Sequence, residues 1–207
     1  STFYDATFIK QNILGILEMD ECGVNTSSQK EKVLDVASEF LNDEMISKLD
    51  NILTPHLLGC EVPKLSDKSF KSKYPIIVWN HRVHTYKGWD MFRDVVNELW
   101  EIRQDFRVWI SFQKDNYSQR SSINQDMLDE TFCLDRDDYY KKLSQSSFGV
   151  ACNSKFMGWN VSACDGLSVG LPYLFYDSPN YRELASDGGL YFKSRNELKS
   201  HMITLLE

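Results

Sequence analysis

Two cationic side chains, Arg82 and Lys87, stand close together after a short apolar run of the sequence. Arginine presents a planar fork of N–H donors that suits phosphate oxygens, and lysine adds a mobile positive charge. Gly88 would let the backbone come close to a ligand and open the next helix. This pattern predicts a site for a diphosphate. An ordinary solvated loop with two surface cations is the alternative, and the residues alone leave both open.

A second segment predicts a helix start. Ser162 is a natural N-cap, and Asp165 stands at the capping-box spacing, with aspartate in place of glutamate. A helix N-terminus offers free N–H groups and a positive dipole to a phosphate, and an acid one turn inside accepts hydrogen bonds from ribose hydroxyls. The pattern therefore predicts a helix cap, a ribose contact or both. Trp159 is interpreted either as a core residue or as a wall of the same pocket.

An acidic triplet at Asp135 and Asp137 has the form that holds a divalent cation in one class of sugar transferases. The preferred interpretation is structural, because Asp137 and Asp138 would fill the first turn of a helix, where negative charge is favoured. The four histidines are dispersed, which argues against nucleophilic catalysis. His81 and His84 flank Arg82 and either line its pocket or, as we expect of a loop histidine, are solvated. The five cysteines never form a Cys-x-x-Cys pair, which predicts free thiols in a reducing compartment.

The bulk composition limits the function classes. The net charge of −7 argues against broad binding to a nucleic-acid backbone. There is no apolar run of about 18 residues, so no membrane span is expected, and the N-terminal residues do not read as a signal peptide. A cytoplasmic protein is the expectation.

Short apolar runs alternate with amphipathic stretches over residues 75–207. Strands are expected at 75–79, 106–112, 131–134, 148–152, 173–176 and 190–192, and helices at 91–100, 137–144, 162–169 and 196–206. Apolar strands separated by helices predict an α/β fold with a parallel sheet covered on both faces. Ligands bind beyond the carboxyl ends of such strands, where both candidate loops lie.

Residues 62–74 divide the chain. This segment is polar, with four lysines and a proline, and lacks periodicity, so it is predicted to be a linker. Residues 1–61 before it are expected to contain helices and short strands, with Ser27 or Ser28 capping one helix and Asn42 starting another.

The cationic segment resembles a motif of glycosyltransferase family 4, whose retaining enzymes have the GT-B architecture of two Rossmann-like domains. In that family a strand leads into an arginine, and a Lys-Gly pair follows five residues later, as at Arg82 and Lys87-Gly88. The family then carries two acids with seven residues between them. Asp165 falls on the second acid, whereas Met157 stands where the first is expected. A Gly-Leu-Pro sequence follows in both, here at 170–172.

Within the family, the sequence is most similar to the tRNA-queuosine mannosyltransferase type, through residues 79–82 and 137–140. The resemblance is strong over 75–193 and weak over 1–61. It implies that 1–61 is the C-terminal edge of the acceptor-side (N-terminal) GT-B domain and that 75–207 is the Rossmann-like domain that binds the nucleotide-sugar. It also implies that a missing N-terminal domain or a second chain completes the acceptor site.

The resemblance further implies roles for individual residues. Arg82 and Lys87 would neutralise the diphosphate of a UDP or GDP sugar, and Asp165 would hold the ribose. The other implied donor-binding residues are Gly88, Leu134, Met157, Gly158, Trp159, Asn160, Val161 and Ser162. The reaction would be hexose transfer with retention of configuration, independent of a metal or any other cofactor.

Three hypotheses follow, and a retaining hexosyltransferase is favoured. The second is a non-catalytic descendant that binds a nucleotide or a partner; it is favoured by Met157, because a thioether accepts hydrogen bonds only weakly. The third is a metal-dependent sugar transferase that uses Asp135 and Asp137. The acceptor, whether a glycan, a small molecule or a modified RNA, is not identified by the sequence.

Overall fold

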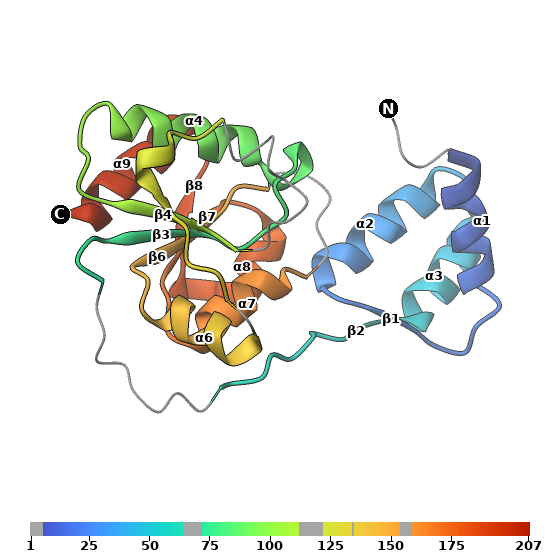
Figure 1. Ribbon diagram of the computed structural model, residues 1–207. Helices are drawn as coiled ribbons and strands as arrows, with labels where there is room; N and C mark the ends of the chain where they lie inside the picture. Colours follow the sequence, from blue (N-terminus) through green and yellow to red (C-terminus); the bar gives the residue numbers. More distant parts are fainter. Residues whose placement is uncertain (1–5, 64–71, 112–121, 134, 154–158) are drawn as a thin grey trace. The chain divides into compact units, whose positions relative to one another are not determined.

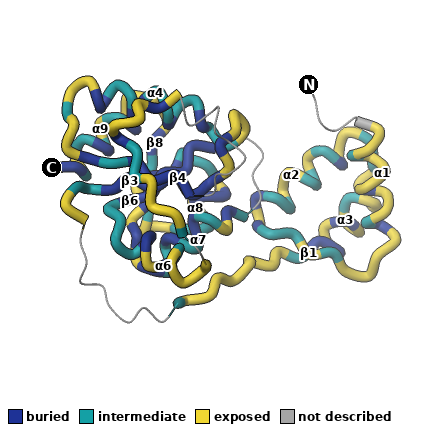
Figure 2. Tube along the Cα trace, in the orientation of Figure 1, coloured by how far each residue is buried: buried dark blue, intermediate teal, exposed yellow. Residues whose placement is uncertain are grey.

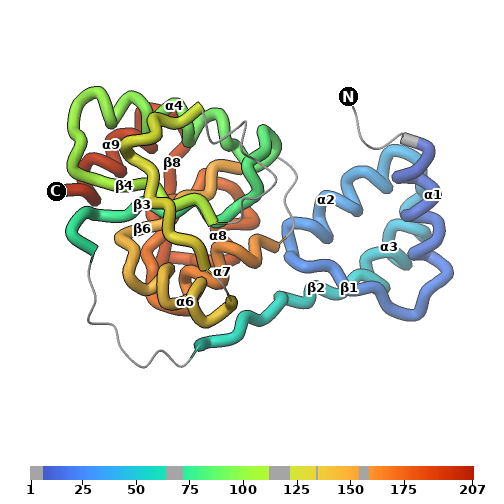
Figure 3. Tube along the Cα trace, in the orientation of Figure 1, coloured from blue at the N-terminus to red at the C-terminus, as the bar shows by residue number. Residues whose placement is uncertain are grey.

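The computed structural model describes residues 6–63, 72–111, 122–133, 135–153 and 159–207. The chain divides into two compact units, Ser1–Gly59 and Cys60–Glu207. Figure 3 follows the path of the chain through both units by colour. No helix in these ranges is long and apolar enough to cross a membrane. Most of the expected linker, residues 64–71, lies outside the described residues.

The first unit consists of three helices and a short parallel pair of strands (Figure 1). Its elements are α1 (Ala6–Ile16), β1 (Cys22–Val24), α2 (Ser27–Ser38), α3 (Asp43–Ile52) and β2 (Leu53–Pro55). The predicted start of α3 is confirmed, because the Asn42 side chain accepts from the Met45 N–H. The predicted caps at Ser27 or Ser28 are wrong: Thr26 caps α2 by accepting from the Gln29 N–H.

The second unit is built on a six-stranded sheet in the order β5-β4-β3-β6-β7-β8, and every pair in it is parallel. The strands are β3 (Ile76–Trp79), β4 (Arg107–Ile110), β5 (Leu128–Asp129), β6 (Phe148–Ala151), β7 (Tyr173–Tyr176) and β8 (Leu190–Phe192). All residues of β3 and β6 are buried, as the dark strands of Figure 2 show. Burial on both faces explains why these strands are apolar throughout rather than alternating.

Helices cover both faces of this sheet (Figure 1). On one face α4 (Trp89–Trp100) and α9 (Arg195–Leu206) enclose an apolar core that includes Trp79 and Phe92. On the other face α6 (Arg136–Ser144), α7 (Val161–Ser168) and α8 (Pro179–Ala185) enclose a second core around Tyr173. The described ranges of the unit also contain the 3₁₀ turns η1 (Thr85–Lys87), η2 (Gln125–Met127) and η3 (Ser186–Gly188). The predicted α/β fold is confirmed.

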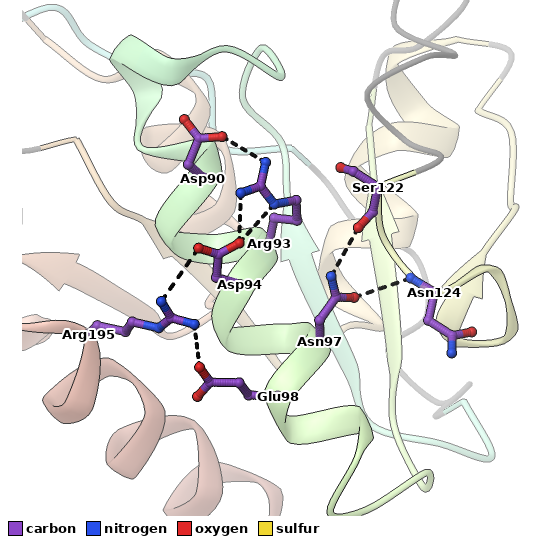
Figure 4. Close-up of polar contacts among 8 residues, drawn as sticks. All are labelled: Asp90, Arg93, Asp94, Asn97, Glu98, Ser122, Asn124 and Arg195. Atoms are coloured by element: carbon purple, nitrogen blue, oxygen red, sulfur yellow. Dashed lines mark hydrogen bonds and ion pairs between the residues drawn. The ribbon is translucent and has the colours of Figure 1, made fainter.

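Polar side chains on the outer face of α4 hold neighbouring segments in place (Figure 4). Arg195 of α9 forms ion pairs with Asp94 and Glu98, and Asn97 hydrogen-bonds the backbone of Ser122 and Asn124. Because such exposed ion pairs contribute only about 0–1 kcal/mol each, their main effect is to orient α9 on α4.

The structure differs from the predicted elements at one strand and one helix. The strand expected at 131–134 is wrong, since β5 occupies Leu128–Asp129, and Leu134 lies outside the described residues. Helix α8, seven residues long, was not predicted, although Pro179 at its first turn is a typical helix start. Neither difference changes the order of the sheet.

Candidate functional site

The strand order places a topological switch point between β3 and β6. β3 comes first along the chain but lies in the middle of the sheet, with β4 and β5 on one side and β6, β7 and β8 on the other. The connections from β3 and β6 therefore leave in opposite directions, and ligands bind at such a switch point beyond the carboxyl ends of the strands. Asn80, His81 and Arg82 follow β3, and Cys152 and Asn153 follow β6.

Gly88 brings the chain that follows β3 close to the chain that follows β6. Its φ of 77° is in the left-handed region, and a Cβ atom on it would lie 2.5 Å from the Cys152 carbonyl oxygen. Such a contact with backbone leaves no room for a side chain, so only glycine fits. The loop after β3 thus packs directly on the chain that leaves β6. Arg82 and Lys87 lie in the same loop, beyond the carboxyl end of β3.

The two predicted cations lie near each other. Arg82 is exposed and Lys87 is half-buried. Burial and then the positive charge of Arg82 lower the pKa of Lys87 below its ordinary value. Within the described part of the chain, Arg82 forms no ion pair with a carboxylate. A bound anion would relieve the repulsion between the two charges, so the arrangement favours a multiply charged ligand such as a diphosphate.

The lowered pKa of Lys87 leads to an expected pH dependence. The ammonium is charged below its pKa, so affinity for a nucleoside diphosphate should be full at neutral pH and should begin to fall below pH 10.5, the ordinary pKa of a lysine. Calorimetric titration over this range measures the effect. Lys87→Arg is the matched control, because its guanidinium keeps its charge. Titration of the ligand itself affects the wild-type chain and the Lys87→Arg variant equally, so it cancels in the ratio of their affinities. A ratio that does not change with pH would contradict the role of Lys87.

His81 is buried, contrary to the solvated loop histidine that was expected. Only 3% of it is exposed. Burial and the charge of Lys87 lower the pKa of His81 to about 3, and a hydrogen bond with the Val150 backbone opposes this shift. The imidazole is therefore neutral at physiological pH. It packs edge-on against Trp79, with ring centroids 5.2 Å apart.

Helix α7 begins one residue earlier than predicted, and its N-cap is Asn160 rather than Ser162. The Asn160 side-chain oxygen accepts from the Ala163 N–H at 3.2 Å, and its amide donates to the Tyr181 hydroxyl at 3.0 Å. Asp165 therefore stands in the second turn of the helix. The capping-box interpretation of Ser162 and Asp165 is wrong.

Asp165 is instead held by two tyrosines of α6. The Tyr140 hydroxyl donates to Asp165 Oδ1 at 3.0 Å, and the Tyr139 hydroxyl donates to Oδ2 at 3.3 Å. Asp165 as a whole is half-buried. The two bonds tie α6 to α7.

Asn80, fully buried after β3, connects these helices to the sheet. Its Nδ2 donates to the Ser162 carbonyl oxygen at 2.6 Å and to the Tyr139 hydroxyl at 3.0 Å. Its Oδ1 accepts from the Tyr173 hydroxyl at 2.9 Å. One amide thus fixes the first turn of α7 and the end of β3 relative to each other.

Two glycines make room for Tyr173 at this point. A Cβ atom on Gly149 or on Gly166 would lie 2.3 Å from an atom of the Tyr173 ring. The ring therefore fits between β6 and α7 only because both positions lack a side chain. Its hydroxyl can then reach Asn80.

The acidic triplet has the structural role that the sequence favoured. The Asp135 side chain caps α6 by accepting from the Asp138 N–H at 2.9 Å, and Asp137 and Asp138 occupy the first turn. In the described ranges, no group of three or more His, Cys, Asp or Glu side chains is placed to hold a metal ion.

Several of the predicted donor-binding residues belong to the loop after β3 and to the start of α7. Others are not among the described residues. Arg82, Lys87 and Gly88 lie in the loop after β3, and Asn80, which precedes this loop, is bonded to the first turn of α7, the helix of Val161, Ser162 and Asp165, whose N-cap is Asn160. Trp159, half-buried, immediately precedes the N-cap of α7. Leu134, Met157 and Gly158 are outside the described residues. Sequence reasoning missed the role of Asn80, although a polar residue that ends an apolar strand is a visible signal.

Comparisons with known proteins show similarity in structure only. No family model matches the sequence, and no curated protein matches it. Among solved structures, S. aureus TarM has a TM-score of 0.72 at 14% identity, over 100% of this chain and 41% of TarM. The pneumococcal O-GlcNAc transferase GtfA, in complex with UDP and GlcNAc, has a TM-score of 0.69 at 12% identity, over 97% of this chain and 40% of GtfA. Anabaena Alr3699/HepE, in complex with UDP-glucose, has a TM-score of 0.75 at 12% identity, over 99% of this chain and 59% of HepE.

These similarities place the fold. The parallel sheet with helices on both faces is the Rossmann-like arrangement of GT-B glycosyltransferases, in agreement with the predicted fold class. The chain spans about two fifths of the length of TarM and GtfA.

Proposed function

We propose that this chain is the donor-binding half of a glycosyltransferase that takes a hexose from a UDP or GDP sugar and transfers it with retention of configuration. The observation that carries the proposal is the meeting of two elements at the switch point: the loop with Arg82 and Lys87, and the start of α7 with Asp165 behind it. Two solved structures of the same fold, GtfA and HepE, contain UDP, which supports this ligand class.

The proposed mechanism is mainly electrostatic. Arg82 and Lys87 neutralise charge that develops on the departing diphosphate, and N–H groups at the start of α7, around Asn160, Val161 and Ser162, add to this stabilisation. One well-placed donor of this kind contributes about 3 kcal/mol to the transition state. Asp165 accepts hydrogen bonds from the ribose. In this mechanism no metal ion or cofactor is needed.

The acceptor side and the location of the protein are further parts of the proposal. We infer that a separate domain or second chain completes the acceptor site, because the chain spans only part of the structures that share its fold. The tRNA-queuosine mannosyltransferase type remains the proposed subfamily, on the residues 79–82 and 137–140. A cytoplasmic location is supported by the free thiols of the described cysteines, which suit a reducing compartment.

The first experiment is calorimetric titration of the chain with UDP, GDP and their hexose derivatives, with and without EDTA. We expect one nucleoside diphosphate to bind equally well in both conditions, because Arg82 and Lys87 supply the positive charge. Loss of binding in EDTA would instead support the metal-dependent alternative. Absence of binding to every one of these ligands would contradict the proposal.

A non-catalytic descendant of the same fold is the second candidate, and Met157 favours it. Where the resembling family has a carboxylate, this position has a thioether, which accepts hydrogen bonds only weakly. The two candidates differ in turnover. Hydrolysis of the bound nucleotide-sugar, followed by release of free hexose, would support the enzyme, whereas binding without any turnover would support the descendant.

A further inference from the structure

The hydrogen bonds around Asp165 have fixed directions. Arg136 donates from Nη2 to the Tyr140 hydroxyl at 2.8 Å, and a guanidinium can only donate. The single proton of Tyr140 is therefore free to point at Asp165 Oδ1, 3.0 Å away. The chain of hydrogen bonds therefore runs in one direction: Arg136 donates to Tyr140, and Tyr140 donates to Asp165.

A second chain of hydrogen bonds reaches the other oxygen of the same carboxylate. The Asn80 amide donates to the Tyr139 hydroxyl at 3.0 Å, so the proton of Tyr139 points at Asp165 Oδ2 at 3.3 Å. The orientation of the amide is assigned from its partners: Nδ2 also meets the Ser162 carbonyl oxygen, which can only accept. The Tyr173 hydroxyl donates to the opposite end.

Both tyrosines remain donors at physiological pH. Burial is the main cause that raises the pKa of Tyr139 and of Tyr140 above the ordinary value of a phenol. Each hydroxyl therefore keeps its proton. Tyr140 is 2% exposed, which excludes it from direct contact with a ligand, whereas Asp165 as a whole is half-buried.

The geometry points to a way in which Asp165 selects ribonucleotides, and this inference rests on the proposed function. We propose that Tyr139 and Tyr140 are positioning residues that fix the plane of the Asp165 carboxylate so that its two oxygens accept the 2′- and 3′-hydroxyls of the donor ribose. A carboxylate offers about four acceptor sites, and each tyrosine occupies one on its own oxygen. Each oxygen keeps a further site for one ribose hydroxyl. The chain should therefore select ribonucleotides over deoxyribonucleotides.

The physical reason is preorganisation. A carboxylate free to rotate could satisfy a single hydroxyl almost as well as two, and would discriminate weakly. Held by a donor at each oxygen, it leaves an acceptor site without a partner when one hydroxyl is missing, and a polar group without its partner is costly in a partly buried site. Sites built to bind a hydroxyl reject ligands that lack it.

The test compares affinities for UDP or GDP, whichever the protein binds, with those for the 2′-deoxy and 3′-deoxy analogues. We expect the wild-type chain to prefer the ribonucleotide by about 10- to 100-fold. Tyr140→Phe and Tyr139→Phe should each reduce this preference by about fivefold or more, because each variant frees the carboxylate at one oxygen. Affinity for the deoxy analogues should change little.

Two further variants separate positioning from folding. Tyr191→Phe is the matched control, since its hydroxyl donates to the Ser186 carbonyl oxygen away from Asp165, and the preference should stay at the wild-type value. Arg136→Ala removes the exposed first donor of the hydrogen-bond chain to Tyr140 and leaves the core unchanged, so this variant should fold. It should lower the preference for the ribonucleotide even if Tyr140→Phe does not fold.

The outcomes distinguish this inference from the proposed function. If UDP or GDP binds but the ratio of ribo to deoxy affinity is unchanged in the Tyr139, Tyr140 and Arg136 variants, the positioning role is overturned and the proposed function stands. If both ligands lose affinity equally in these variants, the tyrosines have only a structural role. If the wild-type chain binds no nucleoside diphosphate, the proposed function fails, and this inference fails with it.

Discussion

Replacing Arg82 by alanine is expected to weaken binding of a nucleoside diphosphate by about 100-fold and to leave binding of the nucleoside unchanged. The guanidinium lies near Lys87, beyond the carboxyl end of β3, and in the proposed complex its charge-assisted hydrogen bonds go to phosphate oxygens alone. Calorimetry with the diphosphate, and competition experiments with the weaker nucleoside, would measure both affinities. Lys87→Ala should show the same selective loss.

Arg103→Ala is the matched control for the loss of one positive charge. Arg103 pairs with Asp105 at 2.7 Å, well separated in the sequence from either candidate loop, and its replacement alters the net charge by the same amount. Affinity for the diphosphate should then change by no more than about twofold. Equal losses for the diphosphate and the nucleoside in Arg82→Ala would show that the assignment of a phosphate clamp is wrong.

Gly88→Ala is expected to destabilise the second unit by about 3 kcal/mol or more and to abolish binding. The new Cβ would lie 2.5 Å from the Cys152 carbonyl oxygen, and the alanine would also have to adopt a φ of 77°. Relief of the contact requires the Arg82 loop to move away from β6. Thermal unfolding should show a decrease in Tm of about 10 °C for a unit of this size.

The chain offers a matched control in Gly170. Its φ is 79°, but a Cβ there would have no neighbour within 4 Å. Gly170→Ala therefore has the conformational strain alone and should cost about 1–2 kcal/mol, with diphosphate affinity preserved. Similar losses of stability in the two variants would mean that the contact with Cys152 does not matter.

Much of the second unit could be predicted because local and tertiary signals agree. Pro75 precedes an apolar run that lies in the middle of the sheet, so the pattern and the burial of β3 coincide. Helix α4 was evident from its apolar face, of which Phe92, Val95 and Leu99 are completely buried. Arg82 and Lys87 were identified for the same reason: they follow a strand whose position was unambiguous.

The remaining features depend on contacts between distant residues. Asn160 and Ser162 are both good N-caps, and Asn160 is the one that also meets Tyr181 after the chain folds. β5 has only two residues, and its pairing with β4 rather than its own sequence defines it. The hydrogen bonds of Asn80 join residues 59 to 93 positions apart, which no periodicity reveals.

The seam between β3 and β6 has a consequence for the order of folding. Each half of the sheet consists of consecutive strands, whereas the bonds that join the halves link Ile76 to Ser147, 71 residues later. Closing this long segment costs the most chain entropy, so the halves are expected to form first and dock last. During synthesis the β3–β5 half also leaves the ribosome first. A ligand that bridges the seam binds only after the two halves have docked. It is therefore expected to slow unfolding and to leave the folding rate unchanged.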